Sequence, residues 1–267
     1  MTVLRSPVVM IHGAFCGGWV FDHWRAAFEA KGHQVHAPTL RYHDRGDDPP
    51  PELGTTSIRD YADDIEQLIE GLPSPPILIG HSMGGLIAQM LAARRDVRAL
   101  VLLAPSAPWG VLPSTPFEFV SAQALYLVGD FWNKRLRPTH WIAAANALDL
   151  LPPAERESVF ARFVPESGLA TFEVMHWPLD FKRATQIDPR DVTCPVLCLV
   201  GAKDRVNPPA TVRRVATRYG GRAVYEELAS HSHWLIGEPD WKKVAARALE
   251  WLAEVVPEKG RRTKVAP

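Results

Sequence analysis

The sequence predicts an α/β protein with a mostly parallel central sheet, helices on both faces of the sheet, and an inserted, mainly helical cap. Short, continuously apolar runs recur between prolines and glycines, which is typical of strands covered on both faces. Amphipathic helical patterns separate these runs, and such alternation favours parallel strands. From about residue 105 to residue 191 the alternation stops, and this segment is rich in proline and aromatic residues with no convincing strand.

Six strands are predicted in chain order. Four of them are short runs of β-branched and other apolar residues, as expected for a buried strand. The strong runs lie at residues 8–11, 77–79, 100–103 and 196–200, and the weaker ones at residues 34–37 and 223–225.

Helices are predicted between these strands from apolar spacing and from end signals. Ser57 followed by Asp60 is typical of a capping box, and Gly71 is expected to end the helix that begins there. Gly32 is expected to cap the C-terminus of an earlier helix. The helices are expected at residues 21–31, 58–72, 86–94, 209–219 and 239–255.

This pattern divides the chain into a core and an insertion. Residues 1–105 and 191–257 are expected to form the core, and residues 106–190 the helical cap, some of whose aromatic side chains face a pocket. Residues 41–54, rich in aspartate and proline, are expected to form a surface loop. Residues 258–267 carry basic residues without apolar periodicity and are expected to form a disordered tail.

Composition restricts the possible partners. The 267 residues include 30 lysines and arginines and 30 aspartates and glutamates, so the basic surplus typical of nucleic-acid-binding proteins is missing. No apolar stretch is long enough for a membrane-spanning helix, and no signal peptide is visible. Three cysteines are too few for a disulfide framework and suit a reducing compartment. We expect a cytoplasmic monomer or homodimer whose partner is a small molecule.

Residues 80–85 read Gly-His-Ser-Met-Gly-Gly and lie between a predicted strand and a predicted helix. A serine at such a tight turn needs residues nearly free of side chains two positions before and after it, here Gly80 and Gly84. The turn exposes the hydroxyl at a helix N-terminus, where the dipole favours developing negative charge. The motif therefore predicts that Ser82 is a nucleophile rather than an ordinary helix cap.

A serine nucleophile needs a base that is held by an acid. Asp204 follows the predicted strand at residues 196–200, so it is expected at the carboxyl edge of the sheet, as Ser82 is. His231 and His233 follow the last predicted strand, and either could be the base. The chain order serine, aspartate, histidine is the order expected with this nucleophile turn.

Two backbone N–H groups must also point at the substrate oxygen as it becomes negative. The first is expected from Met83, directly after the nucleophile. The second is expected from the loop at residues 12–19, His-Gly-Ala-Phe-Cys-Gly-Gly-Trp, whose small residues let the backbone approach a bound carbonyl. Cys16 in this loop is expected to pack rather than to act as a second nucleophile.

These motifs together resemble the α/β-hydrolase superfamily, and the resemblance covers about residues 8–252. The loop at residues 12–19 is similar to that of the carboxylesterase, methylesterase and hydroxynitrile-lyase branch. The resemblance implies the α/β-hydrolase fold, with the variable cap at residues 106–190. It is carried by His-Gly-Ala at residues 12–14, by the motif at residues 80–85, by Gly-Ala-Lys-Asp at residues 201–204 and by His233.

The resemblance also implies roles for individual residues. In the family the residue after His-Gly donates the first oxyanion N–H, which corresponds to Ala14 here. A glutamate commonly follows the family's catalytic histidine by five positions, so Glu238 selects His233 over His231. The catalytic set implied in this way is Ser82, Asp204 and His233.

We expect a serine hydrolase that cleaves a carboxylic ester through an acyl-enzyme on Ser82. The neutral net charge and the aromatic cap favour a small to medium, mostly apolar substrate. Phe15, Trp109 and Trp234 are expected to contact this substrate, and no metal or organic cofactor is expected.

Two alternative functions remain open. The resemblance also allows a carbon–carbon bond hydrolase or lyase, in which a cap lysine, Lys134 or Lys182, would assist. A non-catalytic small-molecule receptor is the other alternative, because fold does not fix function. The histidines and aspartates at residues 33–48, including His43, are interpreted as a solvated loop rather than a metal site.

Overall fold

The computed structural model describes residues 5–256, and the tail expected at residues 258–267 lies outside the described residues. Its centre is a six-stranded sheet of order β2-β1-β3-β4-β7-β8, in which every neighbouring pair is parallel. This sheet confirms the predicted fold class. The strands are β1 (Val8–Ile11), β2 (Val35–His36), β3 (Ile77–His81), β4 (Ala99–Leu103), β7 (Val196–Gly201) and β8 (Ala223–Leu228).

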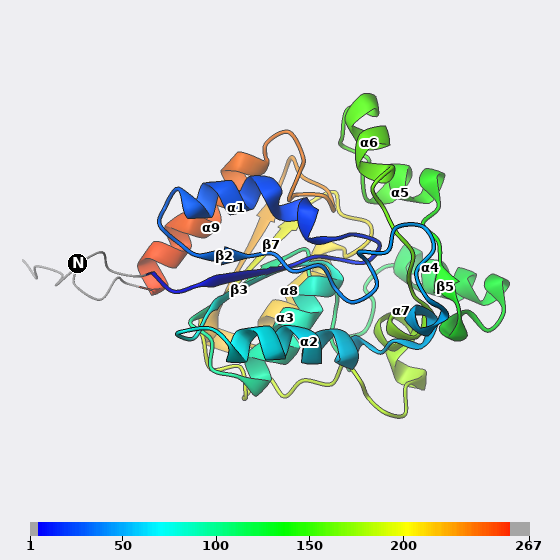
Figure 1. Ribbon diagram of the computed structural model, residues 1–267, viewed down its shortest axis with the longest axis horizontal. Helices are drawn as coiled ribbons and strands as arrows, with labels where there is room; N and C mark the ends of the chain where they lie inside the picture. The colour runs from blue at the N-terminus through cyan, green and yellow to red at the C-terminus, as the bar shows by residue number, and fades with distance from the viewer. Residues whose placement is uncertain (1–4, 257–267) are drawn as a thin grey trace, which may run out of the picture.

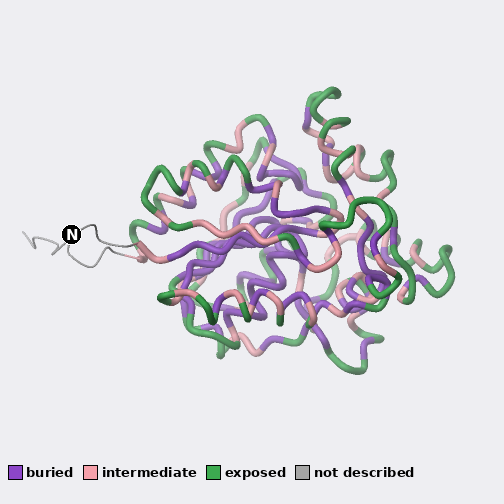
Figure 2. The backbone as a smooth tube through the Cα atoms, in the orientation of Figure 1, coloured by how far each residue is buried: buried purple, intermediate pink, exposed green. Residues whose placement is uncertain are grey.

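Helices cover both faces of this sheet, as Figure 1 shows. One face carries α1 (Asp22–Glu29) and α9 (Trp241–Val255). The other carries α2 (Ile58–Glu70), α3 (Met83–Arg94) and α8 (Pro209–Thr217). Because α3 is apolar all round, it is buried along most of its length between the sheet and its neighbours (Figure 2).

Alternate strand residues supply the two cores. Val8 and Met10 pack among the side chains of α1 and α9, whereas Val9 and Ile11 pack among those of α2 and α3. All four side chains are fully buried. Coverage on both faces explains why the strands read as continuous apolar runs rather than as alternating ones.

The helix ends follow from local chemistry. The capping box is formed, with Ser57 accepting from a backbone N–H and the Asp60 carboxylate accepting from the backbone N–H of Ser57. Gly71 is the C-cap of α2, as predicted. Gly32 has φ +86° and its N–H donates to the carbonyl of Glu29 at 2.8 Å, so α1 ends two residues before the expected Lys31.

Most of residues 106–190, here called the inserted segment, lies beyond the carboxyl ends of the strands (Figure 1), whereas Ala184 and Ile187 pack in the core beside α2 and α3. The expectation that it holds no strand is wrong, because two two-residue strands pair antiparallel there. Strands this short leave no compositional signal. The segment contains α4 (Pro116–Ala124), β5 (Arg135–Leu136), α5 (His140–Asn146), α6 (Pro153–Phe160), β6 (Glu166–Ser167) and α7 (Gly168–Met175).

Six short 3₁₀ helices are also assigned within the described residues. Three belong to the inserted segment, where prolines and glycines interrupt longer helices. The 3₁₀ helices are η1 (Gly18–Phe21), η2 (Pro51–Thr55), η3 (Leu125–Val128), η4 (Phe131–Asn133), η5 (Trp177–Leu179) and η6 (Gly220–Arg222).

The segment at residues 41–54 is only partly the surface loop that was expected. Its aspartates are exposed, but Leu53 is fully buried and η2 occupies its end. His43 is also buried, at 4% exposure, so its interpretation as part of a solvated loop is wrong. Arg41 fixes the start of the segment through an ion pair with Asp64 of α2.

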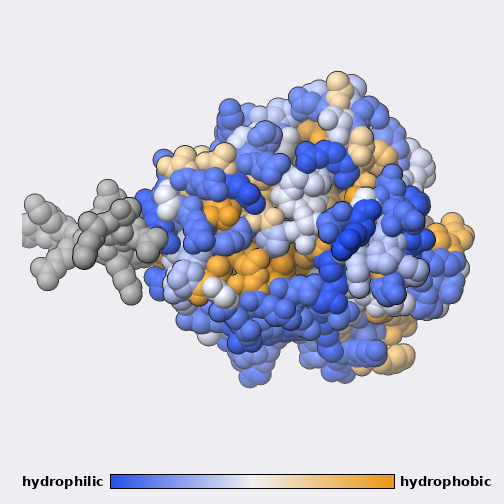
Figure 3. Space-filling model, in the orientation of Figure 1, coloured by the Kyte–Doolittle hydropathy of each residue, from blue (hydrophilic) through white to orange (hydrophobic). Residues whose placement is uncertain are grey.

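The surface is mostly hydrophilic on the face seen in Figure 3, with an apolar band near the middle of the view and smaller apolar patches toward the end where the inserted segment lies. The most exposed of its large apolar side chains are those of Phe181, Leu127 and Trp141. Among the described residues, no helix is both long enough and apolar enough to cross a membrane.

Candidate active site

Ser82 lies on the turn that joins β3 to α3, in a backbone conformation that only close packing can hold. Its φ is +54°, in the left-handed region that costs a non-glycine residue about 1–3 kcal/mol. A Cβ on Gly80 would lie 2.3 Å from the carbonyl oxygen of Gly84, and a Cβ on Gly84 would lie 2.1 Å from that of Ile11. The two glycines are therefore required by backbone contacts on both sides of the turn.

A chain of hydrogen bonds connects Ser82, His233 and Asp204. Ser82 Oγ lies 3.1 Å from His233 Nε2, and His233 Nδ1 lies 2.9 Å from Asp204 Oδ2. Because an ionised carboxylate only accepts, Nδ1 carries the proton and Nε2 is left to accept from the serine hydroxyl. All three residues are at most 9% exposed, so little water competes for these contacts.

Asp204 also stabilises its own turn after β7. Its Oδ1 accepts from the backbone N–H groups of Val206, at 2.8 Å, and Asn207, at 2.9 Å. The carboxylate therefore holds its own turn with one oxygen and faces His233 with the other.

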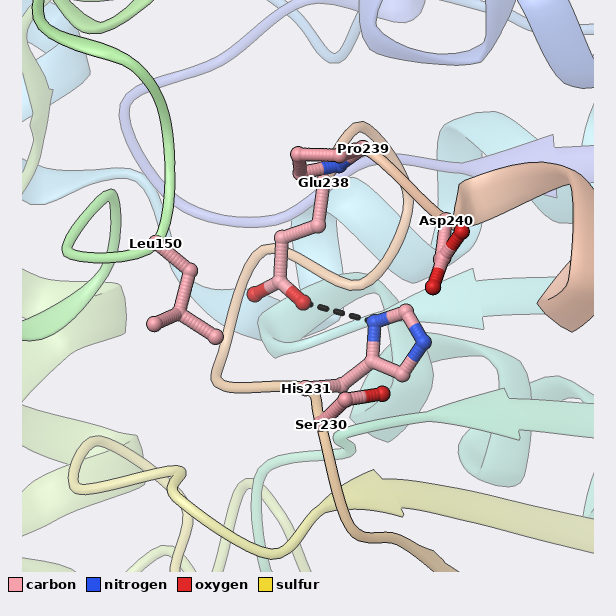
Figure 4. A pocket seen from close by; sticks show the side chains of 6 residues that line it. All are labelled: Leu150, Ser230, His231, Glu238, Pro239 and Asp240. Carbon is pink, nitrogen blue, oxygen red and sulfur yellow. Dashed lines mark hydrogen bonds and ion pairs between the residues drawn. The ribbon is translucent and has the colours of Figure 1, made fainter.

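His231 has a different partner. Its Nδ1 lies 2.7 Å from Glu238 Oε2, and Glu238 also accepts from the backbone N–H of Ser232 at 3.0 Å. Figure 4 shows this pair in a cavity of about 190 Å³ that Leu150 and Asp240 also line. Glu238 therefore contacts His231, although its spacing along the chain was expected to select His233. His233 is the histidine that contacts Ser82.

The loop at residues 12–19, here called the oxyanion loop after its predicted role, lies against the serine. A Cβ on Gly13 would be 2.9 Å from Ser82 Cβ. His12 Nε2 accepts from the backbone N–H of Leu40 at 3.0 Å, so its Nδ1 carries the proton and donates to the carbonyl of Gly13 at 2.8 Å. Burial lowers the pKa of His12 to about 3, which keeps the ring neutral.

The predicted oxyanion donors flank the serine. Ala14 shares a planar peptide with the Gly13 carbonyl, so the bond from His12 also fixes the direction of the Ala14 N–H. Met83 directly follows Ser82 as the first residue of α3. The helix dipole at this position favours negative charge.

His81 supports His233 from behind. Its Nε2 donates to the carbonyl of His233 at 2.9 Å, and the two ring centroids lie 4.9 Å apart. Burial, together with His233, lowers the pKa of His81 to about 3, so His81 stays neutral. Sequence reasoning did not select His81 or the His12 side chain, although both adjoin motif glycines.

The three predicted substrate contacts lie in different settings. Phe15 belongs to the oxyanion loop and is half-buried. Trp109 packs edge-on against Trp177, with ring centroids 5.1 Å apart. Trp234 is only 4% exposed and packs against His81 within the core, so its observed contacts are those of a packing residue. A substrate role for these residues stays a prediction.

Other candidate groups are engaged elsewhere or buried. Lys134 Nζ donates to the carbonyl of Val128 at 2.7 Å and pairs with Asp130 at 3.0 Å, and Lys182 is exposed. Burial raises the pKa of the Cys16 thiol, which therefore remains protonated. Within residues 5–256, no group of three or more histidine, cysteine, aspartate or glutamate side chains is arranged to hold a metal ion.

Known proteins resemble this chain along nearly its whole length. A pyrethroid hydrolase of Sphingobium wenxiniae is 26% identical over 250 residues, covering 87% of this chain and 82% of that protein. A pimeloyl-[acyl-carrier protein] methyl ester esterase of Neisseria meningitidis is 31% identical over 239 residues, covering 86% of this chain and 87% of that protein. A monoacylglycerol lipase structure from Paleococcus ferrophilus has a TM-score of 0.67 at 23% identity, covering 94% of this chain and 96% of that one.

Because the lipase is only 23% identical to this chain, its similarity concerns the fold alone. A model of a whole protein family, described as the alpha/beta hydrolase family, matches residues 8–247. It includes the turn of Ser82, the oxyanion loop and the inserted segment. The chain belongs to the alpha/beta hydrolase family.

Proposed function

We propose that the protein is a serine carboxylesterase that cleaves small to medium, mostly apolar esters through an acyl-enzyme on Ser82. The observation that carries the proposal is the hydrogen-bonded chain from Ser82 Oγ through His233 to Asp204. The names of the two relatives, a pyrethroid hydrolase and a methyl ester esterase, support ester hydrolysis as the reaction.

The proposed reaction has two halves. His233 Nε2 takes the proton of Ser82 as Oγ attacks the ester carbonyl, and the N–H groups of Ala14 and Met83 bind the resulting oxyanion. His233 then gives the proton to the leaving alcohol, which leaves an acyl-enzyme. Water, deprotonated by the same histidine, attacks the acyl group, and Ser82 is released with its proton restored.

The alternative functions have less support. A lyase assisted by a lysine needs an ammonium group at the serine, but Lys134 is bound to Val128 and Asp130 and Lys182 is exposed. A receptor needs no base at Ser82, whereas His233 Nε2 lies 3.1 Å from the hydroxyl oxygen and is itself held by Asp204. No specific observation favours either function.

The proposal is tested with p-nitrophenyl esters from acetate to decanoate, using wild type and Ser82→Ala side by side. We expect turnover by the wild type and a loss of at least about 10³-fold in kcat for Ser82→Ala, because the nucleophile is removed. The chain-length profile sizes the acyl pocket. A wild type that hydrolyses no ester and is not labelled on Ser82 by a fluorophosphonate would refute the proposal.

A further inference from the structure

A glutamate of the inserted segment reaches the oxyanion loop. Glu166 on β6 is fully buried. Its Oε2 accepts from His43 Nε2 at 3.0 Å and from the backbone N–H of Phe15 at 3.3 Å. Its Oε1 accepts from the Tyr61 hydroxyl at 2.7 Å and from the backbone N–H of Ser167 at 2.6 Å. Every contact of this carboxylate is with a donor, and one donor belongs to the oxyanion loop.

Geometry indicates that Glu166 and His43 are both ionised. His43 Nε2 faces Glu166, and His43 Nδ1 lies 3.0 Å from the carbonyl oxygen of Arg41, so both ring nitrogens face acceptors and carry protons. Burial alone opposes both charges, but their mutual attraction and hydrogen bonds raise the pKa of His43 and lower the pKa of Glu166. Since desolvating two charges is costly, such a pair is weak evidence for a role in stability alone.

The inserted segment holds both backbone polar groups of Phe15. The N–H of Phe15 donates to Glu166, and its carbonyl accepts from the N–H of Val164 at 2.9 Å. Phe15 has φ +63°, an unusual conformation for a bulky residue that these two bonds maintain. Its neighbour Ala14 is thereby fixed from the C-terminal side, while His12 fixes it from the N-terminal side through Gly13.

We propose that Glu166, together with His43, is a positioning residue that holds the Ala14 N–H in the direction needed to bind the oxyanion. This inference rests on the proposed esterase function. It makes the inserted segment a part of the catalytic apparatus, because a carboxylate from that segment sets the geometry of a loop in the core.

A simpler explanation is that Glu166 only anchors the inserted segment, and the chain contains a matched control for it. Glu173 on α7 is also a buried carboxylate of this segment, at 3% exposure. It accepts from the backbone N–H of Ile58 at 2.7 Å and from the Ser57 hydroxyl at 2.8 Å, at the start of α2. Glu173 therefore anchors the segment to the core at a place remote in sequence from the oxyanion loop.

The experiment compares Glu166→Gln with Glu173→Gln. Glutamine has nearly the same shape, but its NH₂ must face the backbone N–H of either Ser167 or Phe15, which cannot accept, and it removes the negative charge that pairs with His43 and holds the Phe15 N–H. Removal of an oxyanion donor costs about 10²–10³ in kcat, so a misdirected donor is expected to cost about 10–100-fold for Glu166→Gln with KM within about twofold. The inhibition constant of an aryl trifluoromethyl ketone, which forms a tetrahedral oxyanion adduct on the serine, should rise by the same factor.

Glu173→Gln should lower the melting temperature but leave kcat and the trifluoromethyl ketone inhibition constant within about twofold of wild type. If Glu166→Gln does not fold, Glu166→Asp serves instead. It keeps the charge for His43 but withdraws the carboxylate from the Phe15 N–H, which is already 3.3 Å away. The same loss of kcat and of inhibitor affinity is expected from it.

The outcomes separate this inference from the proposed function. A wild type that hydrolyses esters, with a Glu166 variant whose kcat and inhibition constant match those of Glu173→Gln, would overturn the positioning role and leave the esterase proposal intact. A wild type without esterase activity would overturn both. A parallel loss of kcat and inhibitor affinity in the Glu166 variant alone supports the positioning role.

Discussion

Replacing Asp204 by asparagine breaks one contact of the proposed triad and can keep the others. The asparagine oxygen can still accept from the backbone N–H groups of Val206 and Asn207, now 2.8 and 2.9 Å from Oδ1. Its NH₂ then faces His233 Nδ1 across 2.9 Å. Because both groups would be donors, His233 must move its proton to Nε2, where it can no longer accept from the Ser82 hydroxyl.

The expected size of the effect follows from this change of tautomer. A histidine in the wrong tautomer cannot act as the base, and we expect kcat to fall about 10³–10⁴-fold, equivalent to about 4–5.5 kcal/mol of barrier. The folded state exchanges a charge-assisted hydrogen bond, worth about 1.5–3 kcal/mol, for a neutral one, worth about 0.5–1.5 kcal/mol. Asp204→Ala would be less informative, because it also leaves the N–H groups of Val206 and Asn207 without their acceptor.

The assay is saturation kinetics on a p-nitrophenyl ester that the wild type hydrolyses, with the folded fraction checked by circular dichroism. Glu238→Gln is the matched control, because it alters the neighbouring histidine–carboxylate contact, Glu238 to His231 at 2.7 Å. We expect kcat of the control within about tenfold of wild type. The assignment of acid and base would be wrong if kcat of Asp204→Asn stayed within tenfold of the wild-type value. It would also be wrong if Glu238→Gln lowered kcat as much as Asp204→Asn does.

Two other predictions follow from packing and from buried histidines. Gly84→Ala places a Cβ 2.1 Å from the Ile11 carbonyl oxygen and should lower the free energy of unfolding by about 3 kcal/mol and remove most of the activity. Gly221→Ala, whose Cβ would meet nothing within 4 Å, should change neither quantity. Equal urea midpoints for the two variants would contradict this prediction. Burial lowers the pKa of His12 and His81 to about 3, so the unfolded chain binds more protons below pH 6.5. As the pH is lowered from 6.5 to 5, the unfolding free energy should then fall by up to about 1.4 kcal/mol per pH unit for each histidine. An unfolding free energy from urea denaturation that does not change over this pH range would argue against neutral buried rings.

The sheet and the surroundings of Ser82 were predictable because local physics dictates them. A strand covered on both faces must be apolar along its length, which made β1, β3, β4 and β7 visible. The turn at Ser82 has room only for glycine two positions before and two positions after the serine, so the sequence motif itself indicates the turn. The helix that begins with a capping box was visible for the same reason.

The contacts between distant segments could not be predicted in this way. Glu166 and His43 lie 123 residues apart, and no spacing or periodicity links them. His43 looked solvated because its neighbours are charged and its burial depends on β6, which was itself too short to leave a signal. Glu238 shows the same limit, since its distance along the chain from each histidine did not reveal which ring it contacts.

The close backbone packing at Gly80 and Gly84 has a consequence for how this protein can vary. Every single-base change of a glycine codon that alters the residue introduces a side chain with a Cβ or ends translation. No single-base replacement at these two codons therefore gives a residue that fits between the neighbouring backbone atoms, so neither codon can change by neutral drift. Codons for exposed side chains of the inserted segment, such as those of Leu127 and Phe181, face no such barrier. In a mutant library, surviving diversity should concentrate there while the two glycine codons stay fixed.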